Sequence, residues 1–141
     1  MIFTPYVSTL AGDTVPVRIA QMRKMDARKT TRDPVWQSDW TSEYITESDA
    51  LKYAVRTAED ELVALGMYEI LDRALVVRIV YMEAQPESNP TLCGDARKYT
   101  GIGKLLIAFG IKLSIDNGFG GDVILEAKTD TLAHHYRDDF G

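Results

Sequence analysis

Cysteine is almost absent from this 141-residue chain, in which Cys93 stands alone. An internal disulfide is therefore excluded, and a reducing compartment is the simplest location for such a protein. No apolar run approaches the roughly 20 residues that span a bilayer. The first residues, Met1 to Tyr6, lack the basic start and apolar stretch of a secretion signal. We therefore expect a cytoplasmic protein that does not enter a membrane.

Positive charge is also scarce, since 16 basic residues face 21 acidic ones and the formal net charge is −5. Domains that bind nucleic acids usually carry a basic stripe that neutralises phosphates. The nearest candidate runs from Arg23 to Arg32, but Asp26 interrupts it and Asp33 follows it. We interpret it as a solvent-facing loop or helix surface and expect no nucleic-acid partner. An acidic surface suits a cationic partner such as an amine.

Groups that could hold a metal or act as a nucleophile are few. His134 and His135 are adjacent, and neighbouring side chains on a helix point about 100 degrees apart, which makes a poor chelating pair. No other Cys, His or Asp spacing completes a zinc site. Cys93 has no basic neighbour in sequence that would lower its pKa. We therefore expect no metal and no cysteine nucleophile.

What is present describes one domain covering residues 1–141. The hydrophobic fraction of 45% suffices for a core, and no repeat or Pro/Gly/Ser-rich linker divides the chain. Residues 1–50 give weak patterns. Alternation from Val15 to Met22 favours a strand, and Trp36 to Thr46 fits either a short helix or irregular cover.

Residues 51–141 give clearer patterns. Polar and apolar residues alternate over 52–57, and apolar runs follow over 62–70 and 75–84, joined by short polar turns. Three such runs predict an antiparallel meander. An irregular loop is predicted over 85–98, because Pro86 and Pro90 disfavour regular structure there.

After this loop the spacing of apolar residues becomes helical. Leu105, Leu106, Phe109 and Leu113 predict an amphipathic helix that ends at Asn117-Gly118. A short strand is expected over 122–127 and a closing helix over about 131–139. The order of meander, helix, strand and helix predicts a mixed α/β domain (α+β, with a mixed sheet).

Two glycines one residue apart, Gly101 and Gly103, immediately precede this helix. Backbone without side chains can approach a ligand closely, and the free N–H groups of the first helical turn favour an anion such as a diphosphate. The glycines could equally serve a tight turn. The spacing excludes a P-loop, which ends in Gly-Lys-Ser/Thr, and a dinucleotide fingerprint, which needs a third glycine.

The segment Lys98-Tyr99-Thr100-Gly101-Ile102-Gly103, with its flanking elements, resembles motif A of the GNAT N-acetyltransferase superfamily. The strand before it and the strand over 122–127 match the family's fourth and fifth strands. Residues 132–141 are similar to its closing helix. The resemblance covers about residues 50–141 and implies a GNAT-like fold that binds acetyl-CoA.

The same resemblance implies roles for individual residues. Backbone N–H groups from Thr100 to Lys104 would hold the coenzyme A pyrophosphate, and Met82 and Ala84 would pair with the pantetheine arm. Tyr136 matches the tyrosine that protonates the departing thiolate, and packing of the closing helix is an equal alternative for it. Apart from the resemblance, the transfer needs a general base, and the strand residues Glu69, Glu83 and Glu126 are candidates, of which Glu83 lies nearest the point where the family's fourth and fifth strands separate. The full set of expected cofactor contacts is Met82, Ala84, Lys98, Tyr99, Thr100, Gly101, Ile102, Gly103 and Lys104.

Departures from the family pattern leave two hypotheses open. Lys98 replaces the usual Arg or Gln, and the family's two final strands have no counterpart before Gly141. In the first hypothesis the chain transfers acetyl from acetyl-CoA to a small-molecule or protein amine, and a homodimer could complete the sheet. In the second it is a shortened, non-catalytic module that binds acyl-CoA or a protein partner through an open sheet edge.

Overall fold

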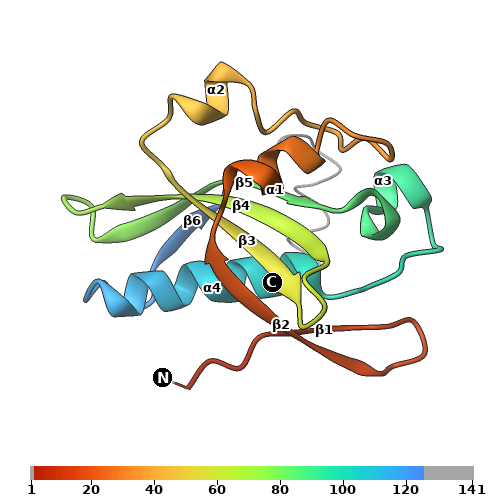
Figure 1. Cartoon of the computed structure of the whole chain (residues 1–141). Helices are drawn as coiled ribbons and strands as arrows, with labels where there is room; N and C mark the ends of the chain where they lie inside the picture. The colour runs from red at the N-terminus through yellow and green to blue at the C-terminus, as the bar shows by residue number, and fades with distance from the viewer. Residues whose placement is uncertain (1, 126–141) are drawn as a thin grey trace.

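The computed structural model describes residues 2–125, which form a mixed α/β structure built on one curled, six-stranded sheet (Figure 1). The strands lie in chain order across the sheet. All neighbouring pairs are antiparallel except β5 and β6, which are parallel. The strands are β1 (Tyr6–Ser8), β2 (Thr14–Gln21), β3 (Leu51–Thr57), β4 (Leu62–Leu71), β5 (Val76–Ala84) and β6 (Val123–Leu125).

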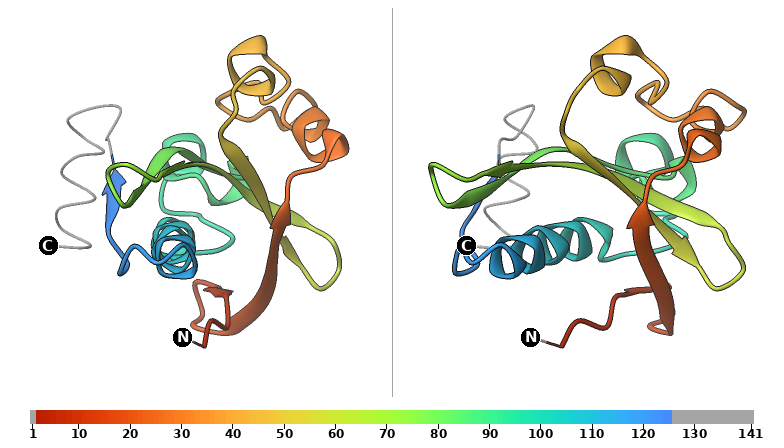
Figure 2. Two further views of the ribbon diagram at one scale, coloured as in Figure 1. Left: turned by 90° about the vertical axis from the view of Figure 1, so that its left-hand side faces the viewer. Right: turned by 60° about the vertical axis from the view of Figure 1, so that its left-hand side comes forward.

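Helices cover both faces of the sheet. The long helix α4 (Ile102–Asp116) connects β5 to β6 and packs on one face, whereas α1 (Lys24–Lys29) and α2 (Glu43–Thr46) lie on the other (Figure 2). Two short helical turns, η1 (Pro86–Ser88) and α3 (Pro90–Cys93), lie in the connection that leads to α4.

Between α4 and the sheet lies a core built largely from aromatic and aliphatic side chains. The ring of Phe109 meets those of Tyr53 and Tyr68 edge-on, with centroids 4.6 Å and 5.5 Å away. The hydroxyl of Tyr68 donates to the carbonyl of Leu106 at 2.7 Å. This bond gives the buried phenol a partner and ties α4 to the middle of β4.

The opposite face of the sheet carries a second core under the α1–α2 segment. Leu65 and Met67 of β4 pack there with Trp40 and Ile45, all at most 3% exposed. Because β4 is central and covered on both sides, its apolar residues form a continuous run rather than an alternating one.

The meander predicted from the sequence is confirmed by β3, β4 and β5, and the strand expected over 15–22 corresponds to β2. The loop over 85–98 was predicted to be irregular, and that prediction is wrong in part because η1 and α3 occupy it. Proline is favourable at the first position of a helix, and Asn89 caps α3 by accepting a hydrogen bond from the Thr91 N–H at 3.0 Å. Strand β1 was not predicted. The helix expected over 131–139 lies outside the described residues.

Candidate functional site

A β-bulge in β5 changes the direction of the backbone groups in the second half of this strand. Met67 pairs with Tyr81 and Tyr68 pairs with Ile79, so Val80 is the extra residue. Beyond the bulge, the N–H of Gln85, which directly follows β5, donates to the carbonyl of Val63 in β4 at 2.8 Å. Successive residues of a strand direct their polar groups to opposite sides. The backbone groups of Met82 and Ala84 therefore point away from β4.

On that far side, β6 pairs with β5 only from Val77 to Ile79. Within residues 2–125, no strand continues this pairing along Met82 and Ala84. The backbone N–H and C=O groups of these two residues thus line an open edge within the described structure. Their side chains pack against the core on the α4 face of the sheet.

The turn that opens α4 presents backbone N–H groups to open space. Gly101 has a φ of +82° and acts as the N-cap. The first hydrogen bond of the helix runs from the Leu105 N–H to the carbonyl of Gly101 at 3.0 Å. The N–H groups of Ile102, Gly103 and Lys104 precede that bond and have no partner within the helix. A Cβ built on Gly101 or Gly103 would meet nothing within 4 Å. The arrangement is a cradle with positive partial charge.

Immediately before this turn, Thr100 is already engaged. It forms an isolated bridge with Ser8, in which each N–H donates to the other's carbonyl at 2.7 Å and 3.2 Å. The Thr100 N–H was predicted to face a pyrophosphate, but in this structure it donates to β1. Of the predicted backbone donors, those from Gly101 to Lys104 donate no hydrogen bond within residues 2–125.

The side chains of Lys98 and Tyr99 meet at Glu61, in the turn between β3 and β4. Lys98 Nζ lies 2.8 Å from Glu61 Oε2, and the Tyr99 hydroxyl donates to Oε1 at 2.7 Å. Burial raises the pKa of Glu61, but hydrogen bonds from Lys98 and Tyr99 outweigh it and leave the pKa below its ordinary value. Lys98 was expected to contact the cofactor, and in this structure its charge is compensated by the carboxylate of Glu61.

One buried donor near this segment has no hydrogen-bond acceptor. The Nε of Arg97 is shielded from solvent and makes no hydrogen bond within residues 2–125. A buried donor without a partner costs about 1–3 kcal/mol. Arg97 directly precedes Lys98, and sequence reasoning did not single it out because a lone arginine in a loop carries no pattern.

Glu83 lies at the open half of β5, but its carboxylate faces the α1–α2 side of the sheet and is 4% exposed. Oε2 accepts from the backbone N–H groups of Gln37 and Ser38 at 2.6 Å and 3.3 Å. Oε1 accepts from Trp40 Nε1 at 3.0 Å and from the Tyr81 hydroxyl at 3.4 Å. A carboxylate offers about four acceptor positions, so these four donors occupy them.

The same region holds Tyr81, which no sequence pattern singles out. Its ring stacks on Trp40, with centroids 5.5 Å apart and planes 8° from parallel. Its hydroxyl and that of Ser38 share a hydrogen bond of 2.6 Å. Burial raises the pKa of Tyr81, the bond with Ser38 lowers it, and nearby Glu83 raises it, so that the net shift is upward. Aromatic residues in an apolar strand give no sequence signal that separates packing from function.

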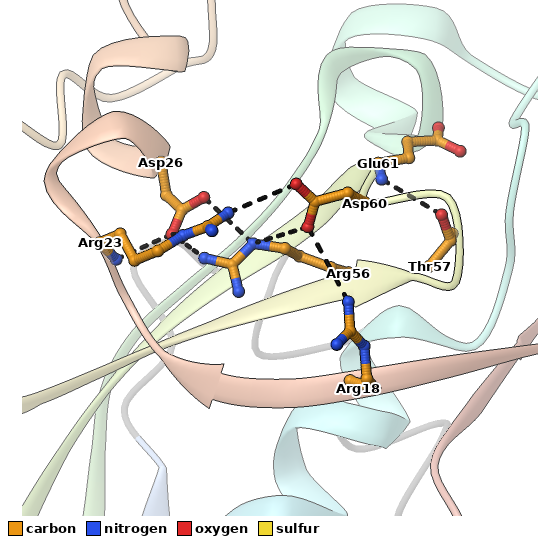
Figure 3. A network of polar contacts seen from close by, with 7 residues as sticks. All are labelled: Arg18, Arg23, Asp26, Arg56, Thr57, Asp60 and Glu61. Carbon is orange, nitrogen blue, oxygen red and sulfur yellow. Dashed lines mark hydrogen bonds and ion pairs between the residues drawn. The ribbon is translucent and has the colours of Figure 1, made fainter.

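Further along the α1 face lies a polar network around two aspartates (Figure 3). Asp26 is fully buried and accepts from the Arg23 N–H at 2.8 Å and from both Nε and a terminal nitrogen of Arg56. Asp60 lies within 3.9 Å of nitrogens of Arg18, Arg23 and Arg56. Arg23, the first of the basic residues at 23–32, thus belongs to a structural ion-pair network. Helix α1 presents Lys24, Met25 and Arg28 to solvent.

A cleft of about 350 Å³ opens between the segment after α1 and the β4–β5 end of the sheet. Trp36, Pro34 and Leu62 supply apolar surface, and the rim carries charges of both signs. Its lining residues are Lys29, Arg32, Asp33, Pro34, Trp36, Glu61, Leu62, Gln85 and Glu87.

Three further expectations concern Tyr136, a metal site and a membrane-spanning helix. Tyr136 lies outside the described residues. Among residues 2–125, no group of three or more His, Cys, Asp or Glu side chains could hold a metal ion. Over the same part of the chain, no helix is long and apolar enough to cross a membrane.

Comparison with known proteins gives no assignment. No family model matches the chain. A search of curated proteins likewise returns no match.

Proposed function

We propose that this chain is a GNAT-like N-acetyltransferase that transfers acetyl from acetyl-CoA to a primary amine. The observation that carries the proposal is the combination of an open edge on β5 and an adjacent helix N-terminus. The backbone groups of Met82 and Ala84 point to that edge. The glycine turn of α4 supplies donors for a diphosphate. The parallel β5–α4–β6 unit supports the GNAT-like fold.

The residues present fit a diphosphate at the α4 turn. Gly103 has an ordinary helical φ and open space beside it, so the fold itself does not require glycine there. A helical glycine costs about 1 kcal/mol relative to alanine, and close approach of a ligand would explain its presence. The buried Nε of Arg97 offers one further donor near Lys98. Acetyl-CoA would supply the acetyl group as a thioester.

For the transfer itself, the chain offers two candidate groups. Tyr136 is proposed as the acid that protonates the departing thiolate, because a phenol and a thiol have comparable reference pKa values. Glu83 is proposed as the base. Its carboxylate lies on the open half of β5. One of its four hydrogen-bond donors would have to leave before the carboxylate accepted a proton. The acceptor is a small-molecule or protein amine, which the net charge of −5 favours.

A second candidate function follows from Glu83. If its four donors stay in place, the chain binds acyl-CoA without a base on β5 and serves as a binding module. Acetyl transfer to an amine separates the two functions, because a module binds the cofactor and gives no turnover.

Calorimetric titration with acetyl-CoA tests the proposal. The wild-type chain is expected to bind at micromolar concentration, and Gly103→Glu is expected to abolish binding by placing a carboxylate in the cradle. An acidic side chain in the first turn of a helix is favourable to folding, so this variant should stay folded. Gln21→Glu adds the same charge on β2 and serves as the control.

Absence of binding by the folded wild-type chain would overturn the proposal. Equal binding by Gly103→Glu would place the cofactor elsewhere and remove the main support for the α4 turn as its site.

A further inference from the structure

The turn between β3 and β4 contacts two separate parts of the molecule. Asp60 and Glu61 are neighbours in the chain, yet their carboxylates point in opposite directions (Figure 3). Asp60 faces the arginines of β2, β3 and the start of α1. Glu61 faces the segment that precedes α4. The turn itself is closed by two bonds between Thr57 and Glu61, of 3.0 Å and 3.2 Å.

Glu61 is the one carboxylate in the described structure that both Lys98 and Tyr99 contact through their side chains. The Tyr99 ring is 7% exposed, so its hydroxyl is directed at Glu61 from within the core. The Lys98 ammonium lies 5.4 Å from the centre of the Tyr99 ring and 2.8 Å from Glu61. The three side chains form one compact group, because each of them contacts the other two.

Hydrogen bonds from their backbone N–H groups also hold residues 98–100. The Lys98 N–H donates to the carbonyl of Glu87 at 2.8 Å, and the Tyr99 N–H donates to Ser88 Oγ at 3.1 Å. Thr100 is bridged to Ser8. The next residue is Gly101, whose positive φ directs the chain into α4. The orientation of the free N–H groups from Gly101 to Lys104 therefore depends on where residues 98–100 are held.

We propose that Glu61 is a positioning residue for the anion site at the start of α4, and that it acts through Lys98 and Tyr99. This inference rests on the proposed function, since the anion is the diphosphate of coenzyme A. Donors that are fixed before the ligand arrives bind it at a lower entropic cost than donors that must be ordered. Glu61 carries no atom that needs to touch the ligand.

The sign of one substitution separates positioning from simple electrostatics. Glu61→Gln removes a negative charge beside a site for an anion. It also releases the Lys98 ammonium from its ion pair. Both changes would strengthen binding of a diphosphate if charge alone mattered. Weaker binding is therefore expected only if Glu61 contributes by holding the segment in place.

The experiment is calorimetric titration of the full chain with coenzyme A. We expect Glu61→Gln to bind about tenfold more weakly than the wild type, which corresponds to about 1.4 kcal/mol. Tyr99→Phe removes only one of the bonds to Glu61 and should show a smaller loss. Glu59→Gln is the matched control, because it removes the same charge from an exposed position in the same turn and should bind as well as the wild type or slightly better.

Equal or tighter binding by Glu61→Gln would overturn the inference while leaving the proposed function intact. If the wild type fails to bind coenzyme A, the proposed function fails, and amide exchange measured by NMR then tests the positioning role by itself. Exchange at the amides of Tyr99 and Thr100 should be at least several-fold faster in Glu61→Gln than in Glu59→Gln. Unchanged exchange would overturn the positioning role.

Discussion

The indole N–H of Trp40 donates a hydrogen bond of 3.0 Å to the carboxylate of Glu83, a residue 43 positions later in the chain. Trp40 is fully buried and Glu83 nearly so. With the N–H groups of Gln37 and Ser38, this bond holds residues 37–40 against the second half of β5. The only charged side chain on the open half of β5 is thus also the anchor of the segment that covers it.

Trp40→Phe should destabilise the protein by about 2–4 kcal/mol. The change leaves one oxygen of a buried carboxylate without a strong donor, which costs about 1–3 kcal/mol, and it adds a cavity term. Urea unfolding followed by circular dichroism measures the effect. Trp36→Phe is the control, because Trp36 is also buried but its indole N–H donates to no carboxylate in the described structure. Equal losses in the two variants would contradict an anchoring role for the Trp40–Glu83 bond.

Acid should weaken the fold through Asp26. Burial raises the pKa of Asp26, but hydrogen bonds from the Arg23 N–H and from the Arg56 and Arg23 side chains leave its pKa below the ordinary value of 3.8. A carboxyl with a lowered pKa in the folded state stabilises fully above that ordinary value. The stabilisation is lost as the pH falls below it.

Asp26→Asn should therefore lower the free energy of unfolding by about 3 kcal/mol at pH 7, because the buried Arg56 loses its closest partner. The deficit relative to the wild type should shrink as the pH falls below about 4. Unfolding measured in urea at several pH values checks both statements, with the exposed Asp95→Asn as the control. A deficit that stays constant down to pH 2 would contradict this assignment.

The two glycines of the α4 turn should respond to alanine with opposite signs. Gly101 has a φ of +82°, where a Cβ costs about 1–2 kcal/mol, so Gly101→Ala should destabilise. Gly103 has an ordinary φ and open space around it, so Gly103→Ala should stabilise by up to about 1 kcal/mol. Thermal unfolding measures both. Destabilisation by Gly103→Ala would show that the fold, rather than a ligand, requires glycine there.

A methyl group at Gly66 should disturb the contact between β4 and α4. A Cβ at this position would lie 2.9 Å from Tyr68 Cε2 and 3.3 Å from Leu106 Cδ2, both in the core. Overpacking of this kind costs about 1–3 kcal/mol. We expect Gly66→Ala to lower the midpoint of urea unfolding, in contrast to Gly103→Ala, where the added methyl meets nothing. An unchanged midpoint would mean that Tyr68 can move aside at little cost.

Several elements could be predicted because their signals are local. Alternation over 52–57 predicted β3, and helical spacing of Leu105, Leu106 and Phe109 predicted α4. Gly118, with a φ of +79°, follows the end of α4 as predicted from Asn117-Gly118. Strand β1 could not be predicted in this way, because three residues contain too little of a repeat.

The candidate site was predictable only in part, because some of its contacts join residues that lie far apart in the chain. Gly101 and Gly103 stand out in the sequence because they adjoin a helix signal. The bridge between Ser8 and Thr100 joins residues 92 positions apart, and the bond from Gln37 to Glu83 spans 46. Neither pairing leaves a trace in spacing or composition. The prediction that Thr100 offers a free N–H therefore did not take β1 into account, where the carbonyl of Ser8 accepts the hydrogen bond from this group.

The meander, the long helix and the glycine turn at its start could all be predicted from the chain, since each follows from residue spacing and backbone preference within a few positions. Which backbone groups stay open within the described residues and which are occupied depends on contacts between distant parts of the fold. The bulge at Val80 set the direction of Met82 and Ala84. Packing of distant segments gave Glu83, Lys98 and Thr100 their partners. Contacts of this kind depend on how elements lie in space, and a polar group's availability is a property of those contacts rather than of its type.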